Sequence, residues 1–378
     1  MAASPKQQRI NPDDVEKGVN ARTSGSKQDG SKQGGAKQPG PKQTPKKGRP
    51  TPKRPAVGPR DAEAREKSAK KAARTPQKNV IEKPKPATAR DWIAGARPQT
   101  LALAIAPVLL GTAVATLFMT APWEHWARAV LCLVVAFALQ IGVNFANDYS
   151  DGIRGTDGAE RQGPRRLVGS GAAKASTVRT VAFVFFGIAA VAGIILTVVS
   201  AQWWLLAVGA LAIVAAWFYT GGKRPYGYAG LGEVVVFIFF GLVATLGTMF
   251  VQAGSINLEG WLVAVAAGMF ACAVLMSNNL RDLEKDALVG KRTLAVIAGP
   301  VVARILYVVF MLVPYAILVF FVLFYFNAGY VYFTLLAALP AILISLFGRS
   351  AREYLVVLRL TVVTTLLYAL GLSAAIAF

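Results

Sequence analysis

The sequence predicts an all-α polytopic membrane protein with nine transmembrane helices and a basic tail at its N terminus. Two observations carry this prediction. First, 54% of the 378 residues are hydrophobic although the formal net charge is +21, a combination that is unusual for a single soluble domain. Second, the charged and the apolar residues occupy different parts of the chain, because residues 1–90 contain 23 Lys and Arg against 8 Asp and Glu.

Residues 1–90 form the predicted tail, and residues 91–378 form the predicted membrane domain. The tail is rich in Lys, Gln, Gly, Pro and Ala, so it cannot bury enough apolar surface to offset its chain entropy, and we expect it to be disordered. Its charge suits anionic lipid headgroups, and a solvated tether is the alternative. Nucleic-acid binding is not expected, because no aromatic residue is interleaved with the basic ones. Deletion of residues 1–88 is expected to leave activity largely unchanged.

Long apolar segments define the helices of the membrane domain. A helix needs about 20 mainly apolar residues to cross the hydrocarbon core of a bilayer. Each segment is too long for a strand and shows no strict alternation of polar and apolar residues, so helices are expected. The expected spans are 100–119, 127–147, 177–199, 202–220, 231–252, 260–280, 301–325, 329–347 and 357–377.

The connections between these spans predict the topology. Four of them contain no Lys or Arg, namely 120–126, 200–203, 252–259 and 326–329. The alternate connections together contain fifteen basic residues. Because Lys and Arg collect in cytoplasmic loops, we expect the N terminus and the long polar loops in the cytoplasm and Phe378 on the outside.

Catalysis built on histidine or on a cysteine–histidine metal cluster is not expected. The single histidine, His125, lies in a short turn between two expected spans. The only two cysteines, Cys132 and Cys272, lie inside apolar segments, so they indicate neither a disulfide framework nor a zinc site.

Two groups of acidic residues occur where an expected helix meets the cytoplasm. The members of the first group recur at i, i+3, i+4 and i+7 and therefore form one polar stripe on a helix: Asn144, Asn147, Asp148 and Asp151. The second group, Asp282 and Asp286, lies one helical turn apart at the end of the sixth expected span. A basic loop follows each group.

Paired carboxylates at such a position have two interpretations. Salt bridges to the nearby Arg and Lys would alone explain them. Mg²⁺, however, is usually bound by one or two carboxylates together with substrate phosphates, and basic side chains complement the oxygens of a diphosphate. Two acidic groups on one membrane face, each followed by a basic loop, favour a Mg²⁺–diphosphate site. At the end of an apolar bundle, this site suggests a lipid-linked diphosphate whose tail lies in the membrane.

A third segment is expected at the same level. Tyr219 and Lys223 end the fourth expected span, and Arg97 lies just before the first. An interfacial aromatic residue with a snorkelling lysine is the alternative interpretation. The functional interpretation is that Lys223 contacts diphosphate while Tyr219 lines an aromatic pocket.

Together these segments resemble the UbiA superfamily of intramembrane prenyltransferases over residues 91–378. The similarity rests on NDYSD from Asn147, DLEKD from Asp282 and the spacing of Tyr219 and Lys223. The segments RQGPRRLV, YTGGKRPYGYAGLGE and GKRTLAV are most similar to the branch that acts on 1,4-dihydroxy-2-naphthoate in menaquinone biosynthesis.

This resemblance implies a fold, a reaction and a location. The fold would be nine helices around a lipid-open cavity in a bacterial cell membrane, with the active site at the cytoplasmic face. The reaction would be the Mg²⁺-dependent transfer of a polyprenyl group from polyprenyl diphosphate to 1,4-dihydroxy-2-naphthoate with loss of CO₂. A related enzyme with another acceptor, such as 4-hydroxybenzoate, remains an alternative. A transporter is less favoured, since its charged residues would be expected near mid-membrane.

The resemblance also assigns roles by position. It implies metal binding by Asn147, Asp151, Asp282 and Asp286, with Asp148 a further catalytic candidate. It implies diphosphate binding by Arg154, Lys223 and Lys291. It implies acceptor binding by Asn144, Tyr219 and Asn279. The last acid of the general family pattern would fall on Gly155, whereas Asp157 comes two residues later, so the metal role of Asp157 stays open. The role of Arg97, a further basic residue at the same face, also stays open.

Overall fold

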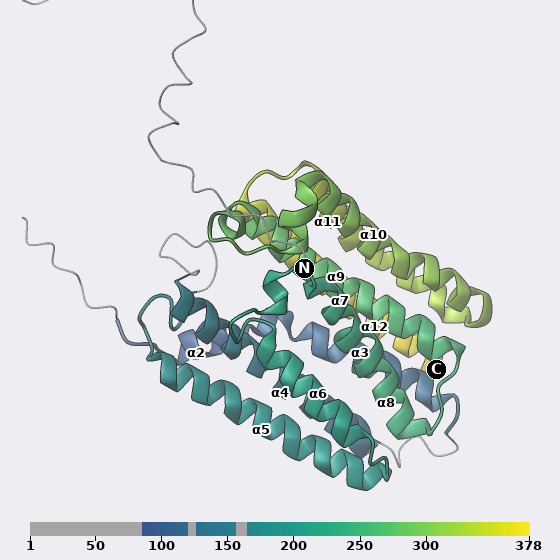
Figure 1. Cartoon of the computed structure of the whole chain (residues 1–378). Helices are drawn as coiled ribbons and strands as arrows, with labels where there is room; N and C mark the ends of the chain where they lie inside the picture. The colour runs from purple at the N-terminus through teal and green to yellow at the C-terminus, as the bar shows by residue number, and fades with distance from the viewer. Residues whose placement is uncertain (1–84, 120–125, 156–164) are drawn as a thin grey trace, which may run out of the picture. The chain divides into compact units, whose positions relative to one another are not determined.

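The computed structural model describes residues 85–119, 126–155 and 165–378, all within one compact unit. The tail up to residue 84, as well as His125 and Asp157, lies outside the described residues. Within the described part the regular structure is helical (Figure 1), apart from one isolated bridge between Ala229 and Arg292. The predicted all-helical class is confirmed.

The first half of the described chain contains six helical elements, of which α4 carries the first acidic group. They are α2 (Ala89–Ala96), η2 (Pro98–Thr100), α3 (Ala102–Thr116), α4 (Trp126–Arg154), α5 (Ala175–Ser200) and α6 (Leu205–Phe218). The second half contains η4 (Tyr226–Tyr228), α7 (Gly232–Val236), η5 (Phe237–Val243), α8 (Ala244–Ala253), α9 (Leu258–Leu288), α10 (Leu294–Phe324), η6 (Phe326–Thr334), α11 (Leu335–Phe347) and α12 (Ala351–Ala377).

Seven helical segments of the described chain are long and apolar enough to cross a membrane. An eighth candidate is the pair formed by residues 89–100 and α3, which is bent by 44°. The bend follows from Arg97, which takes a left-handed backbone conformation (φ 55°) after the last residue of α2 and is followed by Pro98. The apolar helix α6 is shorter, with 14 residues. The protein is therefore a multi-pass membrane protein.

The two helices that carry the acidic groups are longer than a bilayer core. At 1.5 Å per residue, the 29 residues of α4 and the 31 residues of α9 extend for about 44 and 46 Å, against a hydrocarbon thickness of about 30 Å. The polar ends of both helices can therefore lie at the interface while their apolar parts span the membrane.

Close helix packing depends on small residues. A Cβ on Gly241 of η5 would lie 2.6 Å from the Cα of Gly268 in α9, and a Cβ on Gly111 of α3 would lie 2.4 Å from the carbonyl oxygen of Thr245 in α8. Such contacts let helix backbones approach each other in a membrane. In Figure 1, α4 and α5 lie side by side, and α9 packs against α10 and α12.

Candidate active site

An elongated cavity of about 550 Å³ lies among α3, α4, α6, η5, α8 and α9. Its lining follows α4 from Cys132 to Asn147, a rise of about 22 Å. Most of the lining is apolar, and it includes the aromatic residues Trp204, Phe239, Phe240 and Phe250. Polar side chains collect at one end, where the lining includes Arg97, Asn144, Asn147, Tyr219 and Asn278. The shape suits a long apolar chain with a polar head.

The end of α4 is tied to the segment after α6. The carboxylate of Asp151 accepts a hydrogen bond from the Tyr228 hydroxyl. The side-chain oxygen of Asn147 accepts one from the Thr220 hydroxyl at 2.7 Å. The guanidinium of Arg154 donates to the carbonyl oxygens of Thr220 and Gly222. These contacts hold the first acidic group against η4.

The second acidic group lies at the end of α9, and each of its carboxylates has a basic partner. Arg281 Nε donates to Asp282 Oδ1 at 2.9 Å, and Lys291 Nζ lies 3.6 Å from Asp286 Oδ1. The charges of Asp151 and Asp282 both act on Asp286, so the two acidic groups lie within electrostatic range of each other.

Tyr228 connects the two groups, and sequence reasoning did not single it out. Its hydroxyl bonds Asp151, while the guanidinium carbon of Arg154 and the ammonium of Lys291 lie 5.5 and 5.2 Å from its ring centroid. Both distances are within cation–π range. The only signal in the sequence is the run of aromatic residues in PYGYAG, which does not say which ring faces the acids.

Arg166 is a second residue that sequence reasoning left out of the site. Its guanidinium is half-buried, and burial lowers its pKa from the ordinary value, while the charges of Asp148, Asp151 and Asp282 act in the opposite direction. An arginine keeps its charge in such surroundings. In the sequence, Arg166 is one of several basic residues of a loop, and nothing local distinguishes it.

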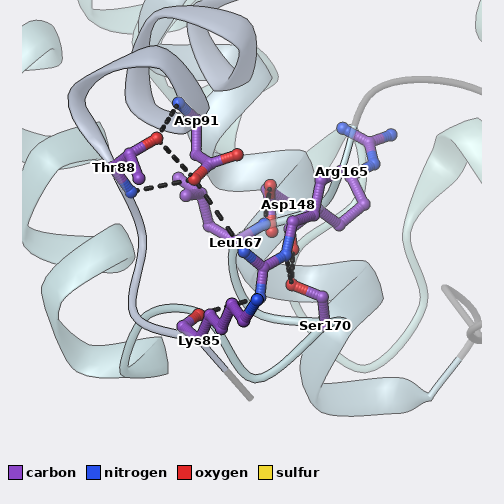
Figure 2. A network of polar contacts seen from close by, with 8 residues as sticks. Lys85, Thr88, Asp91, Asp148, Arg165, Leu167 and Ser170 are labelled. Carbon is purple, nitrogen blue, oxygen red and sulfur yellow. Dashed lines mark hydrogen bonds and ion pairs between the residues drawn. The ribbon is translucent and has the colours of Figure 1, made fainter.

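Asp148 differs from the other acids, because both of its carboxylate oxygens are occupied by one loop. Oδ2 accepts from the amide nitrogen of Leu167 and Oδ1 from that of Val168, each at 2.9 Å, and the side chain is fully buried. Figure 2 shows the Asp148 side chain close to Leu167. The resemblance made Asp148 a catalytic candidate, and the structure shows that both of its oxygens accept amide hydrogen bonds from this loop.

The three acceptor candidates lie differently with respect to the cavity. Asn144 and Tyr219 line it, and the Tyr219 ring packs edge-on against Tyr226 with 5.5 Å between centroids. Asn279 instead is buried and donates to Glu233 Oε1 at 2.8 Å, while its neighbour Asn278 lines the cavity. The helical repeat could have indicated this, because Ala271, Val274, Leu275 and Asn278 share one face of α9 and all line the cavity.

Asn144 makes a further contact, and the positions of Lys223 and Arg97 complete the set of candidates. The Asn144 amide donates to the carbonyl oxygen of Ala96 at 2.9 Å and so ties α4 to α2. Arg97 lines the polar end of the cavity. Lys223 is exposed in the loop after α6, beside the carbonyl groups that Arg154 binds.

The donor set at this mouth fits a magnesium ion that is shared with phosphate. In the described part of the chain, no three His, Cys, Asp or Glu residues form a metal-binding group by themselves. The available donors are carboxylate and amide oxygens, which are hard ligands of the kind that Mg²⁺ takes. Because Mg²⁺ commonly completes its coordination with phosphate oxygens and water, separated carboxylates around a diphosphate suit it better than an all-protein cage would.

Comparison with known proteins decides the family. Residues 105–355 match the UbiA prenyltransferase family. The chain belongs to this family. It is 45% identical over 304 residues to 1,4-dihydroxy-2-naphthoate octaprenyltransferase of Mycobacterium tuberculosis, covering 76% of this chain and 97% of that protein. It is 38% identical over 221 residues to the Escherichia coli protein of the same name, covering 56% and 70%. The family that the motifs predicted is confirmed.

Solved structures of UbiA homologues share the fold. The apo homologue from Aeropyrum pernix K1 superposes with a TM-score of 0.55 at 16% identity, covering 73% of this chain and 96% of that one. The homologue from Archaeoglobus fulgidus bound to GPP and Mg²⁺ gives 0.53 at 13% identity, covering 76% and 100%. The helical arrangement of this UbiA prenyltransferase is thus that of its family.

Proposed function

We propose that the chain transfers a polyprenyl group from polyprenyl diphosphate to 1,4-dihydroxy-2-naphthoate with loss of CO₂ and diphosphate, giving the hydroquinone demethylmenaquinol. One observation carries the proposal: Arg154 and Lys291 flank the Tyr228 ring, whose hydroxyl binds Asp151, while Lys291 also pairs with Asp286, all near the polar end of a long apolar cavity. This arrangement provides a charged site for a diphosphate and an apolar one for its chain. The naphthoate acceptor is supported by relatives named for that substrate, including the one 45% identical to this chain.

The acidic residues of the mouth would bind the diphosphate through Mg²⁺, and the basic residues would bind its oxygens directly. Mg²⁺ would be held by Asn147, Asp151, Asp282 and Asp286, and it would neutralise charge on the departing diphosphate. Lys291 and Arg154 flank Tyr228 and would contact the remaining phosphate oxygens, with the exposed Lys223 completing the basic rim. Asp148 is assigned to the loop and not to the metal, because its two oxygens already accept amide hydrogen bonds.

The cavity would order the two organic reactants. The prenyl chain would lie along the apolar lining, which also excludes water from the allylic cation that forms as diphosphate departs. Asn144, Tyr219 and Asn278 would receive the acceptor at the polar end. The aromatic face of Tyr219 would stabilise nearby positive charge. The new bond forms at the carbon that carries the carboxyl group, and the electron pair of the lost carbon–carbon bond returns to the ring as CO₂ leaves.

The membrane arrangement that we propose has nine spans. Seven long segments, the bent pair and α6 supply them in the described part of the chain. The positive charge of the loops at 165–174, 221–230, 289–293 and 348–352 favours a cytoplasmic N terminus and active site and an outside C terminus. The basic tail would then face anionic lipid headgroups of the cytoplasmic leaflet.

An acceptor panel tests this function. Purified full-length protein is supplied with one polyprenyl diphosphate, Mg²⁺ and, separately, 1,4-dihydroxy-2-naphthoate, 4-hydroxybenzoate or no acceptor. We expect prenylated product from the naphthoate alone. Product from 4-hydroxybenzoate at an equal or higher kcat/KM would replace the proposed acceptor by the alternative one, and the boiled protein serves as the blank.

A further inference from the structure

The loop at residues 165–172 is held on its inner side by α4. Asp148 binds the amide groups of Leu167 and Val168, and all of these atoms lie in a buried or half-buried position. A Cβ on Gly152, one turn further along α4, would lie 2.5 Å from the Val168 side chain. The loop therefore lies directly on the face of α4 that carries the first acidic group.

The same loop is held on its outer side by the segment 85–91, just before and within the first turn of α2. Arg165 Nη2 donates to the carbonyl oxygen of Lys85 at 2.8 Å, and its Nη1 lies 3.9 Å from Asp91 Oδ2. The amide of Ala87 donates to the carbonyl oxygen of Ala172 at 2.9 Å. Figure 2 shows Arg165 reaching from the loop toward Lys85 and Asp91.

The segment 85–91 is itself fixed in place. Thr88 and Asp91 form a capping box at the start of α2, in which the Thr88 amide and hydroxyl both donate to Asp91 Oδ2 at 2.8 Å. Such caps stabilise a helix start by about 1 kcal/mol. The other end of α2 is held by Asn144, which bonds the Ala96 carbonyl. Both ends of α2 are thus held by hydrogen bonds.

Arg166 lies between these two attachments. Its neighbour Arg165 is exposed and bonds the outer segment, whereas Arg166 is half-buried and interacts with the charges of Asp151 and Asp282. Arg166 is therefore flanked in the chain by two residues that are held in place, Arg165 on the outer side and Leu167 on the inner side. Since Asp151 and Asp282 come from the two acidic groups of the mouth, Arg166 lies within electrostatic range of both groups.

We propose that the segment 85–91 is a clamp that positions Arg166 to bind the diphosphate of the prenyl substrate, an inference that rests on the proposed function. Arg166 contacts the diphosphate, because a guanidinium can bind two phosphate oxygens at once. Arg165 and Asp148 are positioning residues, which hold the loop from outside and inside. Holding the guanidinium in its bound position before the substrate arrives reduces the entropy lost on binding.

The clamp changes the expected effect of removing the tail. Deletion of residues 1–88 takes away Lys85, Ala87 and Thr88, which together supply the carbonyl, the amide and the cap on which the loop rests. Deletion of residues 1–84 leaves all of these contacts in place. The clamp therefore places the functional boundary of the tail before Lys85, and it predicts that deletion of residues 1–88 weakens diphosphate binding, in contrast to the expectation from the sequence.

The test measures binding of inorganic diphosphate in the presence of Mg²⁺ by calorimetry, with the full chain, the two deletions, and Arg166→Ala, Arg165→Ala and Arg165→Lys. Arg166→Ala should weaken binding by about 10- to 100-fold, the loss of a charged hydrogen-bonding group. Arg165→Ala and the 1–88 deletion should each weaken it by about three- to tenfold. The 1–84 deletion and Lys174→Ala, which removes an exposed charge from the same stretch of chain, should match the full chain.

Steady-state assays separate positioning from a general loss of fold. In Arg165→Ala the KM for polyprenyl diphosphate should rise while the KM for the acceptor stays unchanged, and Arg165→Lys should recover part of the loss. Equal diphosphate affinity in the full chain, Arg166→Ala and the 1–88 deletion would overturn the clamp. If the full chain transfers no prenyl group but Arg166→Ala, Arg165→Ala and the 1–88 deletion still bind diphosphate more weakly than the full chain, the proposed function is wrong and the clamp is supported.

Discussion

At the scale of single residues, one helical stripe contains acids with different tasks. Asp148 and Asp151 are consecutive members of the polar stripe on α4, and sequence spacing places them on one face. In the structure, Asp148 holds two amides of a loop that returns 19 residues later, while Asp151 meets Tyr228 at the mouth. Helical periodicity could predict the shared face, but the division of tasks depends on a loop whose path no local pattern specifies.

Replacement of each acid by its amide should separate the two tasks. In Asp148→Asn, an NH₂ group replaces one of the two oxygens that accept hydrogen bonds from the loop, so one backbone amide of the loop loses its acceptor. The free energy of unfolding should therefore fall by about 1–3 kcal/mol. Asp151→Asn keeps a partner for the Tyr228 hydroxyl and should leave stability near that of the parent, yet abolish turnover because a metal-binding charge is lost. Thermal unfolding in detergent, combined with the prenyl-transfer assay, measures both. Full activity in Asp151→Asn would remove that residue from the metal site.

At the scale of elements, apolar length predicts where helices lie but not where they break. The nine expected spans all overlap helices of the structure. The left-handed Arg97, the break at Gly299 (φ 81°) within α10 and the π-helical turn η5 were not predicted. Each of these depends on packing against distant elements or on a single backbone angle. The turn η5 lines the cavity with Phe239 and Phe240, so this irregular segment helps to shape the site.

A glycine pair tests the packing of η5 on α9. Gly241→Val should lower the thermal unfolding midpoint, because its Cβ would lie 2.6 Å from the backbone of Gly268, and forced overpacking costs about 1–3 kcal/mol. Gly247→Ala on α8 is the matched control, since a Cβ there meets no atom within 4 Å. Equal unfolding midpoints for the two variants would show that the η5–α9 contact is looser than described.

At the scale of the whole molecule, the sequence allows the reaction to be predicted better than the details of the site. The family, the helical class and the naphthoate-type motifs follow from residues that are close together in the chain. The roles of Tyr228, Arg166 and Asn278 do not, because each depends on how α4, α9 and the intervening loops meet in space. The picture that we propose is a membrane bundle whose apolar cavity would hold the prenyl chain and whose polar mouth would activate the diphosphate.

The most direct test of this picture is to measure CO₂ and prenylated product together from carboxyl-labelled 1,4-dihydroxy-2-naphthoate, with Mg²⁺ and then with excess EDTA. The account predicts one CO₂ for each prenyl group transferred, and neither product once the metal is removed. Prenylation that leaves the carboxyl group in place, or full turnover in EDTA, would contradict it.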